Sequence, residues 1–271
     1  MLIDTHAHLW FDDFSQDLPE VIERAKNADV EKMIVPGTDL DSSKKAIELA
    51  SKYPGIIYAA AGVHPEELLN HKSSDLSFAT LQTALRSELG DQVVAIGEMG
   101  TDASTEELRA CMNEQKELFR VQCEVALELD LPVIIHTRNS FGETWEVLKS
   151  LKKMPRGQFH CFSIDEEALK LVLDAGFYVS FCGNITWSKR VARMVKLVLD
   201  ERLLLETDSP FMIPRIAKVP NSGPESSEPE NNRNEPANVK LLAEIIAELR
   251  GQKLAEIEEM TTANVKTLFQ L

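Results

Sequence analysis

The chain of 271 residues contains 29 lysine and arginine residues against 44 aspartate and glutamate residues, which gives a formal net charge of −15. Apolar residues make up 44% of the chain and charged residues 27%. These are the proportions of a globular protein, so the composition excludes a disordered or fibrous chain. No apolar run approaches the roughly 18 residues that span a bilayer, and the length suits a single domain covering residues 1–271.

Cysteine content and the first residues both predict a cytoplasmic protein. Four cysteines are too few for a disulfide framework. Cys111 and Cys123 are expected on one helix, where a rise of about 1.5 Å per residue places them about 18 Å apart, too far to bond. The segment from Met1 to His6 has neither the basic nor the apolar part of a signal peptide. A reducing compartment is therefore expected.

The acidic balance limits the partners that the chain can attract. A sequence pI near 4.9 works against long-range attraction to a polyanion such as nucleic acid. Contact with phosphate groups would therefore need a local device, such as bound metal ions, that overrides the overall sign of charge.

Short apolar segments alternate with longer segments of helical periodicity along the chain. The apolar segments begin near Leu2, Lys32, Ile56, Gln92, Pro132, Gln158, Tyr178 and Leu203. Their starts are about 29 residues apart, the span of one strand–helix–strand unit. Several, such as residues 93–96 and 133–135, are continuously apolar, as parallel strands covered on both faces are. Eight strands with following helices predict a (β/α)8 TIM barrel of the α/β class, with a doubly wound open sheet as the alternative.

Three segments complete the predicted barrel. Residues Ser104 through Glu107 have the pattern of a capping box, followed by helical apolar spacing from Leu108 to Leu127. Residues 214–235 contain four prolines and a polar run, which predict a long loop after the eighth strand. In a barrel this loop would lie at the carboxyl ends of the strands. A closing C-terminal helix is expected over about residues 254–269.

Residues capable of binding a metal ion gather at the predicted strand ends. They are five of the six histidines and two acids, namely His6, His8, His64, Glu98, His136, His160 and Asp208. Because a barrel brings the carboxyl ends of its strands to one rim, we expect these side chains to converge. His6 and His8 face the same side of an extended strand and can chelate one ion. Imidazole and carboxylate groups suit zinc, manganese or similar divalent ions.

Each of these residues also has an ordinary structural interpretation. His136 and His160 could be hydrogen-bonded core histidines, Glu98 could form a salt bridge at a strand end, and Asp208 could cap a turn. Their joint position at the ends of strands favours a metal site over these separate interpretations.

Other conspicuous residues are expected to be structural. His71, in a polar helical stretch, is predicted to be a solvated surface residue, and Cys161, which alternates away from its neighbour on the strand, to be buried packing. The aromatic side chains of Trp10, Phe162 and Trp187 are predicted to pack in the core or at the rim rather than to stack on bases.

Eight short motifs occur in order along nearly the whole chain. They are residues 4–8 (DTHAH), 62–65 (GVHP), 97–102 (GEMGTD), 136–138 (HTR), 160–162 (HCF), 206–210 (ETDSP), 233–236 (RNEP) and 264–269 (NVKTLF). With these motifs the sequence resembles the TatD-type metal-dependent DNases, hydrolases with a TIM-barrel fold akin to the amidohydrolases.

The resemblance implies two divalent metal ions, with zinc, magnesium and manganese as the possible metals. One ion would be held by His6, His8 and Asp208, the other by His136 and His160, with Glu98 bridging them. The same resemblance makes Asp208 and Glu98 the expected catalytic residues. It places His64, Arg138 and Arg233 at the substrate.

The sequence departs from the usual family pattern at three places. Thr101 stands where leucine is usual, Ala103 and Ser104 stand where an aromatic residue is often found, and Asn139 replaces a common aspartate. These departures bear on substrate preference more than on metal binding.

The implied activity is hydrolysis of phosphodiester bonds, most specifically a 3′–5′ exonuclease acting on single-stranded DNA or frayed ends. No membrane and no obligate protein partner are expected. Two divalent ions roughly 4 Å apart neutralise a phosphodiester and activate water, which answers the objection raised by the acidic charge. An amidohydrolase-like enzyme acting on a carbonyl, ester or lactone is the alternative, and a catalytically inactive binding module is a third interpretation. Many binuclear amidohydrolases bridge their ions with a carboxylated lysine, so Glu98 favours the DNase-type group.

Overall fold

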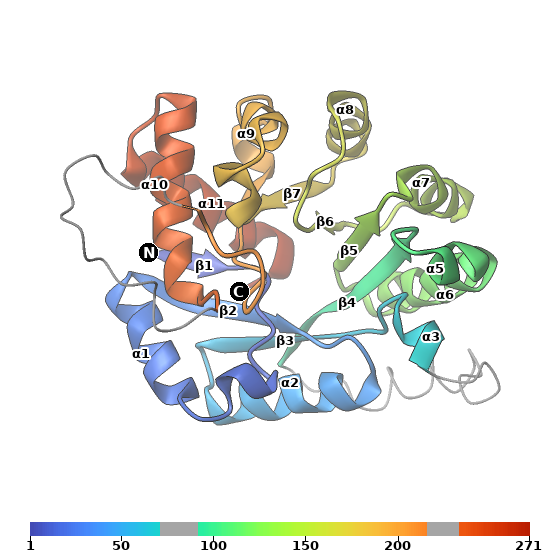
Figure 1. Cartoon of the computed structure of the whole chain (residues 1–271), viewed down its shortest axis with the longest axis horizontal. Helices are drawn as coiled ribbons and strands as arrows, with labels where there is room; N and C mark the ends of the chain where they lie inside the picture. The colour runs from blue at the N-terminus through green and yellow to red at the C-terminus, as the bar shows by residue number, and fades with distance from the viewer. Residues whose placement is uncertain (71–91, 216–232) are drawn as a thin grey trace.

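The structure is a computed structural model that describes residues 1–70, 92–215 and 233–271. Eight strands form one sheet in chain order, each parallel to the next, with helices around its outer side (Figure 1). The strands are β1 (Leu2–Asp4), β2 (Val30–Pro36), β3 (Ile57–Ala61), β4 (Val93–Asp102), β5 (Val133–Arg138), β6 (Gly157–Phe159), β7 (Tyr178–Phe181) and β8 (Leu203–Leu205). Every strand begins within two residues of its predicted start.

Backbone hydrogen bonds join β1 to β8 and so close the sheet into a barrel. The Thr5 N–H donates to the Leu205 carbonyl at 3.0 Å, and the Asp208 N–H donates to the His6 carbonyl at 2.8 Å. One step further, the His8 N–H donates to the Ser209 carbonyl at 2.8 Å. The predicted (β/α)8 barrel is therefore confirmed. Three predicted ligands, His6, His8 and Asp208, take part in the backbone hydrogen bonds that close it.

The helices follow the strands as predicted. They are α1 (Leu18–Asn27), α2 (Leu40–Lys52), α3 (Glu67–Asn70), α5 (Glu106–Ala110), α6 (Met112–Leu129), α7 (Phe141–Ser150), α8 (Glu166–Asp174), α9 (Lys189–Val195), α10 (Val239–Arg250) and α11 (Leu254–Phe269). The expected closing helix is confirmed as α11. His71 and most of the expected loop over residues 214–235 lie outside the described residues.

The helix after β4 differs from its prediction in two respects. Its cap is Thr105, whose hydroxyl accepts the Leu108 N–H at 3.2 Å, because Ser104 is occupied in a turn in which its N–H donates to the Asp102 carboxylate at 2.7 Å. The helix also breaks at Cys111, between α5 and α6. Cys111 and Cys123 therefore do not share one continuous helix, and both are free thiols.

Apolar side chains fill the barrel on both sides of its wall. One residue or two from each of seven strands belong to one buried cluster, namely Ile3, Ile34, Ala60, Val94, Ala95, Ile134, Tyr178 and Leu204. Val265, Leu268 and Phe269 of α11 pack against this cluster. Alternate residues such as Met33 and Val35 pack instead with the surrounding helices, as the two-residue period of a strand requires. A packed interior leaves the carboxyl ends of the strands as the place for a site.

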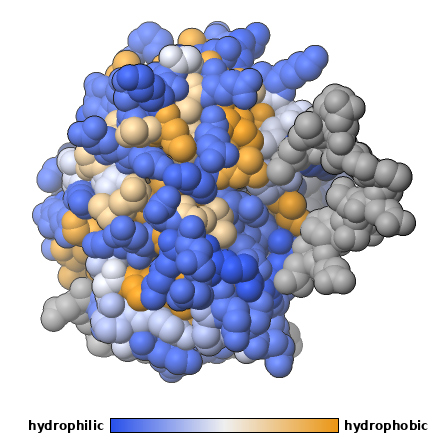
Figure 2. All heavy atoms as spheres, turned by 90° about the vertical axis from the view of Figure 1, so that its left-hand side faces the viewer, coloured by the Kyte–Doolittle hydropathy of each residue, from blue (hydrophilic) through white to orange (hydrophobic). Residues whose placement is uncertain are grey.

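One face of the outer surface can be judged from Figure 2. The face seen in Figure 2 is mostly hydrophilic, with apolar side chains in small groups. Among the described helices, none has the length and apolar content needed to cross a bilayer.

Candidate metal centre

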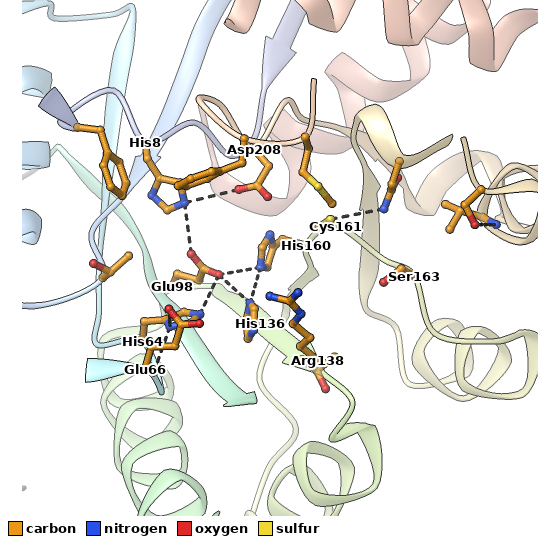
Figure 3. A pocket seen from close by; sticks show the side chains of 18 of the residues that line it. His8, His64, Glu66, Glu98, His136, Arg138, His160, Cys161, Ser163 and Asp208 are labelled. Carbon is orange, nitrogen blue, oxygen red and sulfur yellow. Dashed lines mark hydrogen bonds and ion pairs between the residues drawn. The ribbon is translucent and has the colours of Figure 1, made fainter. Parts of the chain in front are cut away.

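The carboxyl ends of the strands surround a cavity of about 710 Å³. Five predicted ligands line it, namely His8, Glu98, His136, His160 and Asp208, and His64 lies among them (Figure 3). The sixth predicted ligand, His6, has no exposed surface and lies in contact with this group. The structure thus brings together residues from β1, β4, β5, β6 and β8 that are up to 202 positions apart in sequence, from His6 to Asp208.

Glu98 stands at the centre of these residues. Its Oε2 atom lies 3.3 Å from His6 Nε2 and 3.5 Å from His8 Nε2. Its Oε1 atom lies 2.8 Å from His160 Nε2 and 3.0 Å from His136 Nδ1. Each carboxylate oxygen therefore faces a different pair of imidazoles, and the dashed lines of Figure 3 show part of this arrangement.

The first cluster consists of His6, His8, Asp208 and the Oε2 atom of Glu98. The two imidazole Nε2 atoms are 3.1 Å apart, and Asp208 Oδ1 lies 3.7 Å from that of His6 and 3.6 Å from that of His8. Donor atoms that bind one tetrahedral zinc ion at about 2.0–2.1 Å are about 3.3–3.4 Å from one another. The spacing and the chemistry of this donor set fit a divalent cation.

The second cluster consists of His136, His160 and the Oε1 atom of Glu98. His136 Nδ1 lies 3.1 Å from His160 Nε2. On its other side, His136 Nε2 lies 3.0 Å from the Oδ2 atom of Asp102, a carboxylate with no exposed surface. This partner fixes the tautomer, with the proton on Nε2 and the lone pair of Nδ1 directed at Glu98, as ligating histidines require.

Two carboxylates that support the second cluster were assigned no role from the sequence. Asp102 ends β4 beside β5, and Glu206 follows β8. Glu206 Oε1 lies 3.6 Å from His160 Nδ1 and accepts the Cys161 N–H at 2.6 Å. For Asp102 the available signal was an acid in a strand-end motif beside a histidine on the neighbouring strand, whereas Glu206 and His160 follow β8 and β6, which are separated by β7.

Gly100 allows β4 to approach β5 closely enough for the contact between Asp102 and His136. Its φ is +151°, and a Cβ at this position would lie 1.9 Å from the His136 carbonyl oxygen. Any other residue would push the two strands apart or change the backbone angle. The close approach of the two strands therefore requires the second glycine of the 97–102 motif, Gly100.

The carboxylates of the centre are held in their ionised form. Burial raises the pKa of Glu98, but the imidazoles of His160 and His6 outweigh it and hold that pKa well below its usual range. Burial likewise opposes the lowered pKa of Asp208, which results from the hydrogen bond with His8 and the nearby imidazoles. Ionised carboxylates next to imidazole nitrogens form a donor set that demands a cation.

The chain matches the model of the TatD related DNase family over residues 3–270. It belongs to this family. The chain is 38% identical over 274 residues to an uncharacterized metal-dependent hydrolase, YabD, of Bacillus subtilis, covering 100% of both chains. It is 34% identical over 272 residues to the 3′-5′ ssDNA/RNA exonuclease TatD of Klebsiella pneumoniae, covering 99% of this chain and 97% of that one.

Solved structures of TatD proteins share the fold. The Escherichia coli TatD homologue YjjV superimposes with a TM-score of 0.86 at 30% identity, over 100% of this chain and 98% of its own. A TatD family hydrolase of Entamoeba histolytica gives 0.82 at 24% identity, over 99% and 97%, which bears on the fold alone. The predicted membership in the TatD family is confirmed, and with it the class of metal-dependent hydrolase.

His64, part of a TatD motif, lies beside the second cluster with its Nε2 atom 3.5 Å from Glu98 Oε1. Its Nδ1 atom accepts the Glu66 N–H at 3.2 Å, so the proton resides on Nε2. Burial lowers the pKa of His64 to about 3, which keeps the ring neutral at pH 7. A ring whose Nε2–H points into the site is a hydrogen-bond donor and has no lone pair there for a metal ion.

The two arginines expected at the substrate of this TatD protein lie in different places. Arg138 lines the cavity, and its guanidinium forms no hydrogen bond or ion pair with any described residue. Arg233 is not among the described residues that line the cavity. Its Nη2 atom lies 2.6 Å from Asp17 and 3.0 Å from Glu235, and its guanidinium lies over the Phe14 ring at 4.7 Å. The Arg233 guanidinium therefore belongs to an ion-pair network with Asp17 and Glu235.

The departures from the TatD pattern lie outside the cavity lining. Thr101 has no exposed surface and bonds to Ser140 Oγ at 2.8 Å and Thr144 Oγ1 at 2.6 Å, so its hydroxyl turns toward α7. Asn139 takes a left-handed backbone angle, φ 57°, which asparagine and aspartate both tolerate. Neither residue contacts the candidate metal centre.

Three residues expected to be packing have different outcomes. Phe162 is 2% exposed, which confirms its prediction. Cys161 lines the cavity, contrary to expectation, because the strand ends at Phe159 and Cys161 has a left-handed φ of 46°, so strand alternation no longer applies. Trp187 lies at the rim of the cavity and is 38% exposed.

Proposed function

We propose that this TatD protein is a two-metal phosphodiesterase that degrades single-stranded DNA from its 3′ end. The observation that carries the proposal is the position of Glu98, which presents each carboxylate oxygen to a different pair of histidines. His6, His8 and Asp208 would hold one ion, His136 and His160 the other, and Glu98 would bridge them. When bound, two divalent ions neutralise a phosphodiester and supply an activated water.

The remaining chemistry is assigned to side chains of the cavity. Asp208, ionised at neutral pH because its pKa is lowered, is the proposed general base that accepts a proton from water. Its carboxylate is 15% exposed and reaches the cavity. His64 donates its Nε2–H to a phosphoryl oxygen, and Arg138 pairs with a phosphate of the bound strand.

The choice of substrate has two supports. The relative from Klebsiella pneumoniae carries the name 3′-5′ ssDNA/RNA exonuclease, which makes RNA the second nucleic acid to be tested. The cavity lies at the end of a barrel whose interior is packed, so an extended chain enters it by an end rather than passing through. We further propose that the protein acts in the cytosol, without a membrane or an obligate protein partner.

Metal content tests the site directly. Protein stripped of metal and then equilibrated with excess Zn²⁺ or Mn²⁺ should approach two ions per chain. The substitution His136→Ala should leave about one ion, while the matched substitution Arg156→Ala, outside the cavity, should leave two. A wild-type protein that binds no metal under these conditions would overturn the assignment.

Hydrolysis of end-labelled oligonucleotides tests the activity. With metal present, single-stranded DNA should shorten from its 3′ end, and a chelator should abolish the reaction. Closed circular single strands should resist, and their efficient cutting would contradict entry by an end. Metal-dependent hydrolysis of esters or lactones with no action on DNA or RNA would establish the amidohydrolase-like alternative.

A further inference from the structure

Aromatic side chains border the cavity and expose much of their surface to solvent. Phe11, Trp187 and Phe211 line it together with the candidate metal ligands. Phe211 is 50% exposed and Trp187 is 38% exposed. Exposed aromatic surface in a cavity is available for a ligand with an apolar face.

The ring of Phe211 is held firmly beside the first cluster. It meets the ring of Phe11 edge to face, with centroids 5.5 Å apart, and that of the candidate ligand His8 at 6.2 Å. Phe11 in turn stacks on Trp10 at 4.3 Å, and the indole N–H of Trp10 donates to the Pro36 carbonyl at 2.7 Å. The ring is therefore fixed by its neighbours while half of its surface stays open.

The backbone also couples Phe211 to the proposed general base. The Phe211 N–H donates to the Asp208 carbonyl at 2.9 Å. Trp187, in contrast, lies beside the start of α9, where the Arg215 guanidinium covers its ring at 4.9 Å from the centroid. The cavity therefore presents one open aromatic ring next to the metal ligands and a second one elsewhere on its border.

Charge alone provides little attraction for a nucleic acid here. The chain has a net charge of −15, and Arg138 and Arg190 are the basic residues among the cavity lining that the structure describes. Stacking of a base on an aromatic ring requires no charge on the protein, and it operates on any base sequence. An acidic exonuclease with exposed aromatic rings has this means of holding its substrate.

We infer that Phe211 is a stacking platform for the nucleobase next to the scissile phosphate, and that Trp187 stacks a neighbouring base. The inference rests on the proposed function, because it concerns the substrate strand of that reaction. Such stacking makes the protein prefer a strand whose 3′ end carries bases over a bare sugar–phosphate chain. The same platform serves DNA and RNA, since both offer a base with a flat apolar face.

The experiment compares two oligonucleotides labelled at the 5′ end. One carries thymidine at its last two 3′ positions, and the other carries tetrahydrofuran abasic residues there, with the same phosphodiesters. Wild type should prefer the base-bearing strand in kcat/KM by about 5- to 150-fold, which is about 1–3 kcal/mol at about 1.4 kcal/mol per tenfold. Phe211→Ala should reduce this ratio to within a few-fold of one, and Phe211→Tyr should restore it.

The matched control is Leu199→Ala. Leu199 is also 50% exposed and does not line the cavity, so its substitution should leave the ratio unchanged. A wild type that cleaves neither oligonucleotide contradicts the proposed function itself. A wild type that cleaves both equally, or a Phe211→Ala variant that keeps the wild-type ratio, overturns the stacking inference alone. Loss of a concentration-dependent dimer in Phe211→Ala, at an unchanged ratio, would assign the ring to contact between copies of the chain instead.

Discussion

The two clusters on either side of Glu98 are positioned by different means. In the first cluster, the strand segments that carry His6, His8 and Asp208 are tied together by the backbone hydrogen bonds that close the barrel. The Nδ1 atoms of these two histidines have no hydrogen-bond partner in the part of the chain that the structure describes. In the second cluster, by contrast, the Asp102 carboxylate lies 3.0 Å from His136 Nε2. Glu206 lies 3.6 Å from His160 Nδ1, an atom that also has no hydrogen-bond partner among the described residues.

This difference separates two kinds of sensitivity. Main-chain bonds fix the first cluster without an ionised partner, so removing a side-chain charge there should affect chemistry more than geometry. In the second cluster the ionised Asp102 carboxylate orients His136, so neutralising it should weaken metal binding, as loss of such a partner usually does by about 10- to 100-fold. Substitutions on each side of Glu98 can therefore be told apart by their readouts.

The largest effect is expected from Asp208→Asn in the first cluster. Asparagine keeps the shape and one ligand oxygen, but its amide cannot accept a proton. Because the closure bonds and the other ligands remain, the variant should retain much of its metal, especially in the second cluster. Turnover should fall by about 10²- to 10⁴-fold, the usual contribution of a general base.

Metal stoichiometry and turnover measured on the same sample decide the role of Asp208. A variant that holds both ions and turns over within tenfold of wild type would show that Asp208 only ligates. A variant that loses the ion of the first cluster would show that its oxygen is needed for binding, which would weaken the contrast between the two clusters.

A smaller effect is expected from Asp102→Asn, and it concerns metal binding rather than turnover. The carboxylate of Asp102 holds His136, and the hydrogen bonds from His136 and Ser104 outweigh burial and lower its pKa to about 2. Its negative charge is therefore present throughout the working pH range. Neutralising it should weaken metal binding at the second cluster by about 10- to 100-fold and leave the first ion in place.

Titration with Mn²⁺ or Zn²⁺ measures this effect as two separate binding steps. The control is Asp41→Asn in α2, whose side chain is 88% exposed and outside the cavity, and it should show both steps unchanged. Equal weakening of both steps in Asp102→Asn would show that the two clusters share one support.

The sequence predicts the barrel and the convergence of its ligands because both depend on strand ends, which apolar runs mark clearly. It does not reveal Asp102 as a support, because its role depends on the register between β4 and β5, nor Glu206, because β7 separates β8 from the strand that His160 follows. Cys161 was misplaced because β6 ends before it. The ion pair between Arg233 and Asp17 was not predicted, because the two residues are 216 positions apart in sequence, a distance that no local pattern spans.

The substitution Arg233→Gln tests how much the ion pairs of Arg233 stabilise the segment that packs next to the first cluster. The neighbouring Asn234 donates from its amide to the Thr207 carbonyl at 2.8 Å, so this segment braces the turn that carries Asp208. Removing the guanidinium leaves Arg24 as the remaining partner of Asp17 and Glu235 and should lower the free energy of unfolding by about 0.5–1.5 kcal/mol, the usual contribution of a hydrogen bond. At a low temperature, where the variant remains folded, its affinity for DNA should equal that of wild type.

The loss of stability should depend on pH. Hydrogen bonds from Arg233 and Arg24 lower the pKa of Asp17, and those from Arg24 and Arg233 outweigh burial to lower that of Glu235. Groups with a lowered folded pKa stabilise the protein above their unfolded values of about 4, and this contribution is lost as the pH falls. The difference between wild type and Arg233→Gln, from denaturant unfolding, should shrink below that pH. An undiminished difference in acid would exclude the ion pairs as its cause.

The smallest effect concerns Arg138, the arginine that does reach the cavity at the second cluster. Each phosphate neutralised on a single strand contributes about −0.7 to the slope of log affinity against log salt. With Arg138 and Arg190 as the basic groups of the described lining, the slope should be about −1.4, far shallower than for proteins with many phosphate contacts. Arg138→Gln should bring the slope to about −0.7. Stability should change by less than about 0.5 kcal/mol, because the residue is exposed and its side chain pairs with no described residue. Fluorescence anisotropy of a labelled oligonucleotide at constant metal, in an Asp208→Asn background that slows cleavage, measures both slopes. Equal slopes would show that Arg138 contacts no phosphate, and a slope change in Arg233→Gln instead would restore that residue to the substrate.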